Sequence, residues 1–258
     1  MLLSVHGVTY RYESADAGLP ALQNVSFDVS EGEFVSILGP SGCGKSTLLY
    51  LLGGFLRPTA GAVHYRGEEV GAPSRERGIV FQDFALFEWR TAMQNVEFGL
   101  ECLGMHAEDR RRKAGAILEL VGLSGAADKF PRQLSGGMKQ RVAIARSLAA
   151  EPVLLLMDEP FAALDALTRE TLQDELRRIW IATRKTIVFV THSVEEAVYL
   201  SQRVIVMTAR PGEVQAFVDI PLGEVRERDT LLEDESFIGL RHTLGVMVRG
   251  SARAGEAA

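Results

Sequence analysis

One glycine-rich segment, residues 39–47, has the residue types and the spacing of a phosphate-binding loop. It matches the pattern G-x-x-x-x-G-K-[ST]. Because glycines let backbone N–H groups point inward and a following helix adds a partial positive charge, such a loop binds polyphosphates. We expect Lys45 to reach the β- and γ-phosphates of a nucleotide and the Ser46 hydroxyl to bind Mg²⁺. The residues expected to contact the nucleotide are Gly39, Ser41, Gly42, Cys43, Gly44, Lys45, Ser46 and Thr47.

The segments on either side of this loop are those that the motif requires. An apolar run at residues 34–38 predicts a strand, and a second one at residues 48–52 predicts a helix that ends at Gly53 and Gly54. The alternative is a glycine-rich turn that binds no ligand. The strand–loop–helix context favours nucleotide binding over that alternative.

A pair of acids, Asp158 and Glu159, follows another apolar run at residues 153–157. A strand that ends at two carboxylates places them at the carboxyl edge of a sheet, where α/β proteins bind ligands. We expect Asp158 to hold Mg²⁺ through water, and Glu159 to accept a proton from an attacking water. The alternative, two surface acids at a strand end, is disfavoured by the phosphate-binding loop, because both groups then converge on one site.

The order of the predicted elements favours an α/β fold. Apolar strand-like runs at residues 153–157 and 186–190 alternate with helical patterns, which is typical of a mainly parallel core sheet with flanking helices. Strands are also predicted near the N-terminus, at residues 5–12 and 25–29, with a loop around residues 15–18 between them. A late helix is predicted over residues 231–248.

Composition narrows the classes of protein to consider. The chain has 258 residues, is 47% hydrophobic and carries a net charge of −6, which is ordinary for a soluble domain and shows no overall nucleic-acid footprint. The basic cluster at residues 110–113 is interpreted as a solvated helix face, with a nucleic-acid patch as the alternative. No apolar run approaches the roughly 18 residues of a membrane span, so we expect any membrane contact to involve a partner protein. The two distant cysteines suit a reducing compartment.

A third motif, Ser135-Gly136-Gly137, stands at the start of a predicted helix. Its hydroxyl and backbone N–H groups are donors suited to phosphate. Residues 134–140, taken together with the phosphate loop and the acid pair in this order, resemble the signature motif of ATP-binding-cassette (ABC) ATPases. Alone, the same residues would be a turn before a helix.

The resemblance extends over residues 3–218 and assigns further roles. Gln82 matches the Q-loop glutamine, which contacts Mg²⁺ and the attacking water. Asp165 matches the D-loop, and His192 matches the switch histidine that contacts the γ-phosphate. Tyr12 matches the aromatic residue that stacks on adenine, although Tyr10 lies on the same strand face.

The resemblance also implies a fold and its subdivisions. We expect an ABC-type nucleotide-binding domain of the P-loop NTPase class over residues 3–235, with an antiparallel β subdomain and an α-helical subdomain at about residues 90–135. Residues 236–258 are expected to form a C-terminal helix and a frayed tail.

Within the family, the chain resembles the ATP-binding subunits of nitrate/sulfonate/taurine-type importers, through residues 81–83, 158–161, 163–169 and 191–197. It departs at Ala162, where glycine is usual, and at Glu88, where proline is usual. The resemblance implies ATP and Mg²⁺ as ligands, and a head-to-tail dimer in which each serine turn closes over the partner's nucleotide. Transmembrane permease subunits, an indirectly associated solute-binding protein and a peripheral location at the cytoplasmic face of the membrane are implied as well.

Two other classes of protein fit this sequence less well. A non-transport ABC ATPase of translation or DNA repair would carry two cassettes or a long coiled-coil arm, and the interval from Thr47 to Ser135 is too short for such an arm. A P-loop nucleotide kinase would leave residues 134–140 and His192 unexplained.

Overall fold

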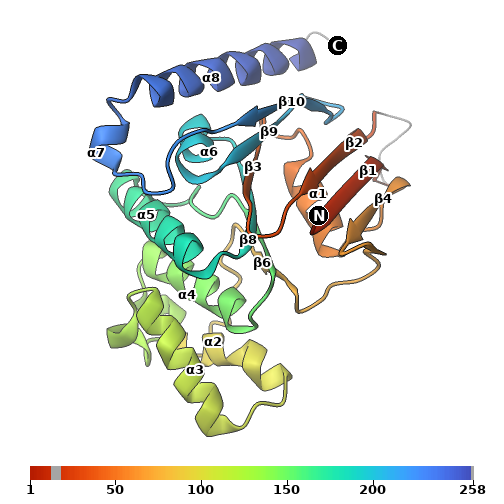
Figure 1. Cartoon of the computed structure of the whole chain (residues 1–258). Coiled ribbons are helices and arrows are strands. Elements are labelled where there is room, and N and C mark those ends of the chain that lie inside the picture. Colours follow the sequence, from red (N-terminus) through yellow and green to blue (C-terminus); the bar gives the residue numbers. More distant parts are fainter. Residues whose placement is uncertain (13–18, 257–258) are drawn as a thin grey trace. The chain divides into compact units, whose positions relative to one another are not determined.

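The computed structural model describes residues 1–12 and 19–256, so the loop predicted around residues 15–18 lies outside the described part. The chain divides into two compact units (Figure 1). The first unit comprises Met1–Pro73 and Thr186–Ala258, and the second comprises Ser74–Lys185.

The first unit contains an antiparallel sheet with the strand order β2-β1-β4-β5. Its strands are β1 (Leu3–Tyr10), β2 (Leu22–Val29), β4 (Ala60–Tyr65) and β5 (Glu68–Glu69). The pairing of β1 with β2 shifts register between Val5 and Val8, and Gly7 between them has a φ of 57°. Because a bulge of this kind needs a residue that tolerates positive φ, glycine is the residue that fits there.

A second set of strands in the first unit is mainly parallel. It consists of β3 (Phe34–Leu38), β8 (Thr186–Thr191), β9 (Arg203–Met207) and β10 (Val214–Asp219). β3 pairs in parallel with both β8 and β9, and β10 closes the set antiparallel to β9. Every residue of β3 and β8 is buried, as expected for parallel strands covered on both faces.

The described residues of the first unit form four helices: α1 (Lys45–Gly53), α6 (Val194–Leu200), α7 (Arg228–Leu231) and α8 (Glu235–Glu256). α1 ends at Gly54 in the left-handed conformation, with φ 81°, where an added Cβ would meet the Ala72 backbone at 2.5 Å. α8 contacts α6 and β9, and buries Phe237 and Leu244.

The second unit places helices around a pair of parallel strands. The strands are β6 (Arg77–Val80) and β7 (Leu154–Asp158), and the helices are α2 (Ala92–Cys102), α3 (Ala107–Leu120), α4 (Gly136–Ala149) and α5 (Ala166–Thr183). Short 3₁₀ turns cover Ser124–Ala126 and Pro131–Gln133. α4 contacts α2, α3, α5 and β6, so it is the central helix of this unit (Figure 1).

Within residues 1–12 and 19–256, none of the helices combines the length and the apolar character that crossing a lipid bilayer requires.

Candidate nucleotide-binding and catalytic site

The phosphate-binding loop connects β3 to α1, as the sequence predicts. Gly44 is the N-cap of α1. Because glycine has no side chain, no side-chain cap occupies the backbone N–H groups of the first helical turn. Its φ is 94°, and an added Cβ would lie 2.7 Å from both the Ala21 carbonyl oxygen and the Leu22 side chain. Gly42 also has a positive φ, 77°. The turn therefore requires glycine at both positions.

Lys45 directs its ammonium group into this loop. The side chain is 5% exposed, and Nζ donates hydrogen bonds to the carbonyl oxygens of Gly39 (2.9 Å) and Pro40 (3.0 Å). This arrangement suits a polyphosphate, because the buried ammonium group and the helix N-terminus both create a positive potential that attracts an anion.

Tyr12 lies beside the first turn of α1. Its hydroxyl shares a hydrogen bond with Thr47 Oγ1 (2.8 Å), and its ring meets the ring of Tyr10 edge-on at 4.9 Å. The side chain is 46% exposed. An accessible aromatic face next to the phosphate loop suits stacking on a base.

His192 follows β8 at the strand edge that also carries the phosphate loop. In the parallel pairing of β3 with β8, Leu38 is opposite Thr191, so Gly39 and His192 leave adjacent strands at the same level. The Thr191 hydroxyl donates to the carboxylate of Glu196 (2.5 Å) and accepts from the N–H of Ser193 (3.0 Å), which fixes the turn around His192.

In the second unit, Gln82 and the acid pair leave adjacent strands in the same way. Val80 of β6 is opposite Met157 of β7, so Gln82 and Asp158 lie at one carboxyl edge. Asp158 is 3% exposed, whereas Gln82 is exposed. Glu159 has a φ of 42°, a left-handed conformation that non-glycine residues seldom adopt and that is concentrated at functional sites.

The serine turn forms the N-terminus of α4. Ser135 is the N-cap, and its hydroxyl oxygen accepts the N–H of Met138 at 3.3 Å. An added Cβ on Gly136 would lie 3.3 Å from the Leu164 side chain, and one on Gly137 would collide with Thr168. The two glycines therefore let the turn pack closely against the start of α5.

Asp165 is the N-cap of α5, and its carboxylate accepts the N–H of Thr168 at 3.0 Å. Hydrogen bonds from the backbone and the hydroxyl of Thr168 lower the pKa of this exposed carboxyl below its ordinary value. The serine turn and Asp165 thus lie next to each other in the second unit.

The predicted residues accordingly form three groups. Tyr12, the phosphate loop and His192 gather in the first unit, while the second unit holds Gln82 with the acid pair, and Ser135 with Asp165. Oxygen donors such as the Ser46 hydroxyl and the Asp158 carboxylate are the kind of ligand that Mg²⁺ prefers, so the residues present fit this ion.

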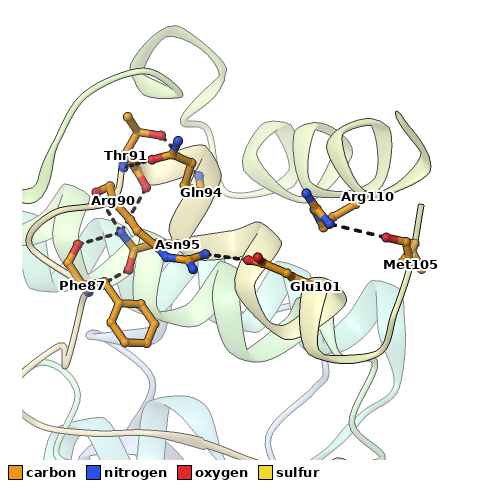
Figure 2. A network of polar contacts seen from close by, with 8 residues as sticks. All are labelled: Phe87, Arg90, Thr91, Gln94, Asn95, Glu101, Met105 and Arg110. Atoms are coloured by element: carbon orange, nitrogen blue, oxygen red, sulfur yellow. Dashed lines mark hydrogen bonds and ion pairs between the residues drawn. The ribbon is translucent and has the colours of Figure 1, made fainter. Parts of the chain in front are cut away.

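Two polar residues that the sequence did not single out hold the loop after Gln82. Asn95, fully buried in the first turn of α2, accepts the N–H of Phe87 (2.9 Å) and donates to the carbonyls of Phe87, Arg90 and Thr91 (Figure 2). Arg146 in α4 donates hydrogen bonds to the carbonyls of Phe84 and Ala85. A buried polar residue within a helical stripe is the signal that would have found Asn95.

Comparisons with known proteins identify the family of this chain. A family model for ABC transporters matches residues 22–162. An ABC transporter ATP-binding protein of Methanocaldococcus jannaschii is 51% identical over 229 residues, which cover 89% of this chain and 86% of that protein. The taurine import ATP-binding protein TauB of Yersinia pestis is 48% identical over 223 residues, covering 86% of each chain.

Solved structures of ATP-binding cassettes have the same fold as this chain. A dimeric ATP-binding cassette in a post-hydrolysis state, bound to ADP and Pi, is 36% identical with a TM-score of 0.75 and covers 86% of this chain and 100% of its own. CbiO1 of Clostridium perfringens, part of the CbiONQ transporter complex, is 28% identical with a TM-score of 0.77, covering 92% and 93%. The predicted resemblance is confirmed: this chain belongs to the ABC transporter family, as a subunit that binds and hydrolyses ATP with Mg²⁺.

Proposed function

We propose that this chain is the ATP-hydrolysing subunit of an importer, and that it drives solute uptake through a separate transmembrane permease. The similarity to taurine import ATP-binding proteins, at 47–48% identity over 223 residues, supports import. It also favours a cargo of the nitrate, sulfonate or taurine class, delivered by a solute-binding protein. A peripheral position at the cytoplasmic face of the membrane follows from this role.

The site residues have different roles in ATP binding and hydrolysis. The phosphate loop and Lys45 bind the ATP phosphates, and Tyr12 stacks on the adenine. Glu159 accepts the proton of the attacking water, while Gln82 and His192 orient that water and the γ-phosphate. Mg²⁺, when bound by Ser46, Asp158 and Gln82, neutralises charge on the phosphates. The protein contributes mainly positioning and charge stabilisation.

Two copies of the chain form the working ATPase. The serine turn of one copy, with Asp165 beside it, closes over the nucleotide bound by the phosphate loop of the other. A dimeric cassette among the similar structures supports this arrangement. The observation that supports the proposal is that Ser135 is the exposed N-cap of α4, because a hydroxyl beside a glycine-rich helix N-terminus offers donors suited to phosphate.

The test is to purify the tagged chain from its own cells and identify what accompanies it. We expect a multi-spanning membrane protein, and uptake of radiolabelled taurine, another sulfonate or nitrate by proteoliposomes of that complex with its solute-binding protein. Lys45→Ala is the inactive control, because it removes the phosphate-binding ammonium. Copurification with ribosomes or DNA, and with no membrane protein, would favour the non-transport alternative.

A further inference from the structure

Arg146, in the last turn of α4, holds an unusual turn in the loop that follows β6. Phe84 and Ala85 have φ values of 51° and 49°, a left-handed conformation that side chains other than glycine rarely adopt. The Arg146 guanidinium donates to both of their carbonyls, at 3.1 Å and 2.5 Å, and lies 5.8 Å from the centre of the Phe87 ring. Burial lowers its pKa from the ordinary value, although an arginine remains charged.

Ser147, the next residue of α4, holds the other side of the same segment. Its hydroxyl donates to the carbonyl of Ile79 in β6 at 2.8 Å. Gln82 lies three residues after Ile79 and two before Phe84. The end of α4 is therefore hydrogen-bonded to the backbone on both sides of Gln82.

The other end of α4 carries the serine turn. The helix runs from its N-cap Ser135 through 14 residues, a length of about 20 Å. Val142, Ala143 and Ala145, in the middle of it, are buried. α4 is therefore a firm support for Arg146 and Ser147, because close-packed interiors deform little.

We propose that Arg146 and Ser147 are positioning residues for Gln82: their hydrogen bonds to the backbone before and after it hold the Gln82 side chain where it acts. The inference rests on the proposed function, in which Gln82 orients the attacking water.

The decisive experiment is a double-mutant cycle on ATP hydrolysis by the purified chain. Arg146→Ala should lower kcat roughly tenfold or more, because a small misplacement of a positioning group costs that much. ATP affinity should be unchanged. In the Gln82→Ala background, Arg146→Ala should have no further effect, because it acts through Gln82. A residue needed only for stability would lower kcat by the same factor in both backgrounds, which would overturn the proposal.

A second substitution restores the turn without the arginine. Because glycine tolerates a φ of 49°, Ala85→Gly should recover most of the lost kcat in the Arg146→Ala background. Trp89, 74% exposed in the same loop, gives a spectroscopic signature once Trp180, the other tryptophan of the chain, is replaced by phenylalanine in every variant compared. Its fluorescence anisotropy should fall in Arg146→Ala and return in the double variant, and no recovery of either quantity would contradict the proposal.

Arg112→Ala is the matched control, since its side chain is 80% exposed on α3 and forms an ion pair with Asp109. It should leave kcat unchanged. If Arg146→Ala does not fold, Arg146→Lys carries the same cycle, because an ammonium lacks the fork that reaches two carbonyls. Unchanged kcat in Gln82→Ala alone would instead refute the assigned role of Gln82, which separates failure of the proposed site from failure of this inference.

Discussion

At the scale of single residues, Glu159 combines a catalytic assignment with an unusual backbone. It directly follows the buried strand β7 and has a φ of 42°. Such strain persists only where the surroundings impose it, and it aims the side chain in a direction that a strand residue would not have. Replacing Glu159 with glutamine keeps the size of the side chain and removes the carboxylate that acts as the base.

We therefore expect Glu159→Gln to bind ATP as the wild type does and to hydrolyse it at least about a hundredfold more slowly, the usual contribution of a general base. Stalled hydrolysis should also trap the dimer, which size-exclusion chromatography in ATP and Mg²⁺ detects. Glu119→Gln, on the exposed side of α3, is the control and should behave as the wild type. A fully active Glu159→Gln variant would remove Glu159 as the base.

The buried amide of Asn95 stabilises the loop between β6 and α2. It makes hydrogen bonds to three residues of the loop between β6 and α2, so truncation leaves several backbone groups without a partner. Asn95→Ala should lower the free energy of unfolding by about 2–3 kcal/mol, measured by urea denaturation.

Gln94→Ala is the matched control for this prediction. Gln94 is the adjacent amide of the same helix, but it is exposed and bonds one backbone group, the N–H of Thr91. Its loss should cost less than half as much, about 0.5–1 kcal/mol, as expected of a helix-capping contact. Equal effects of the two substitutions would show that the loop does not depend on Asn95.

At the scale of elements, the hydrophobic pattern predicted most strands and helices but not their ends. β2 begins at Leu22, three residues before the predicted start, and β1 ends at Tyr10 rather than at residue 12. The two ends are set together, because Tyr10 pairs with Leu22, and such pairing is not visible in the hydrophobic pattern of either segment. Apolar strands covered on both faces, such as β8, carry a continuous signal and were placed within one residue.

The features of the site also differ in how well the sequence predicts them. The phosphate loop, the acid pair and the serine turn are local motifs, so their sequence alone shows them. Arg146 donates hydrogen bonds to Phe84 and Ala85, which lie 62 and 61 positions away in the sequence, so these contacts depend on tertiary packing. Neither Phe84 nor Ala85 is a glycine, so their residue types do not indicate a positive φ. Nothing local in the sequence predicts such a contact.

The cap of α5 allows a prediction about pH. Asp165 has a lowered pKa, because Thr168 donates hydrogen bonds to its carboxylate. A group whose pKa is lower in the folded state stabilises the fold above its unfolded value of about 3.9, and the contribution is lost as the pH falls through the lowered value. Asp165→Ala should therefore lower the melting temperature at pH 7, and the difference from the wild type should shrink on acidification below pH 4.

Asp165→Asn separates charge from capping. Asparagine caps helices about as well as aspartate but does not titrate. Its melting temperature should exceed that of Asp165→Ala by an amount that does not change between pH 7 and pH 3, as followed by circular dichroism. A wild-type advantage over Asp165→Ala that persists undiminished at pH 3 would show that the carboxylate is not the stabilising group.

At the scale of the whole molecule, the proposed head-to-tail dimer assigns the phosphate loop and the serine turn of each ATP site to different copies of the chain. The phosphate loop belongs to the first unit, and the serine turn belongs to the second. Ser135 can be changed without losing its cap, because aspartate is as good an N-cap as serine. Ser135→Asp should thus keep the fold and bind ATP at its own phosphate loop, yet repel the phosphates of the partner's nucleotide.

Mixing two inactive variants tests the head-to-tail arrangement directly. A dimer of one Ser135→Asp chain with one Lys45→Ala chain combines an intact phosphate loop from the first with an intact serine turn from the second, so one complete ATP site forms. We expect ATPase activity in the mixture that neither variant shows alone, with Ser135→Asn mixed with Lys45→Ala as a capped but uncharged control. If each serine turn instead served its own chain's nucleotide, every chain in the mixture would carry a broken site and no activity would return.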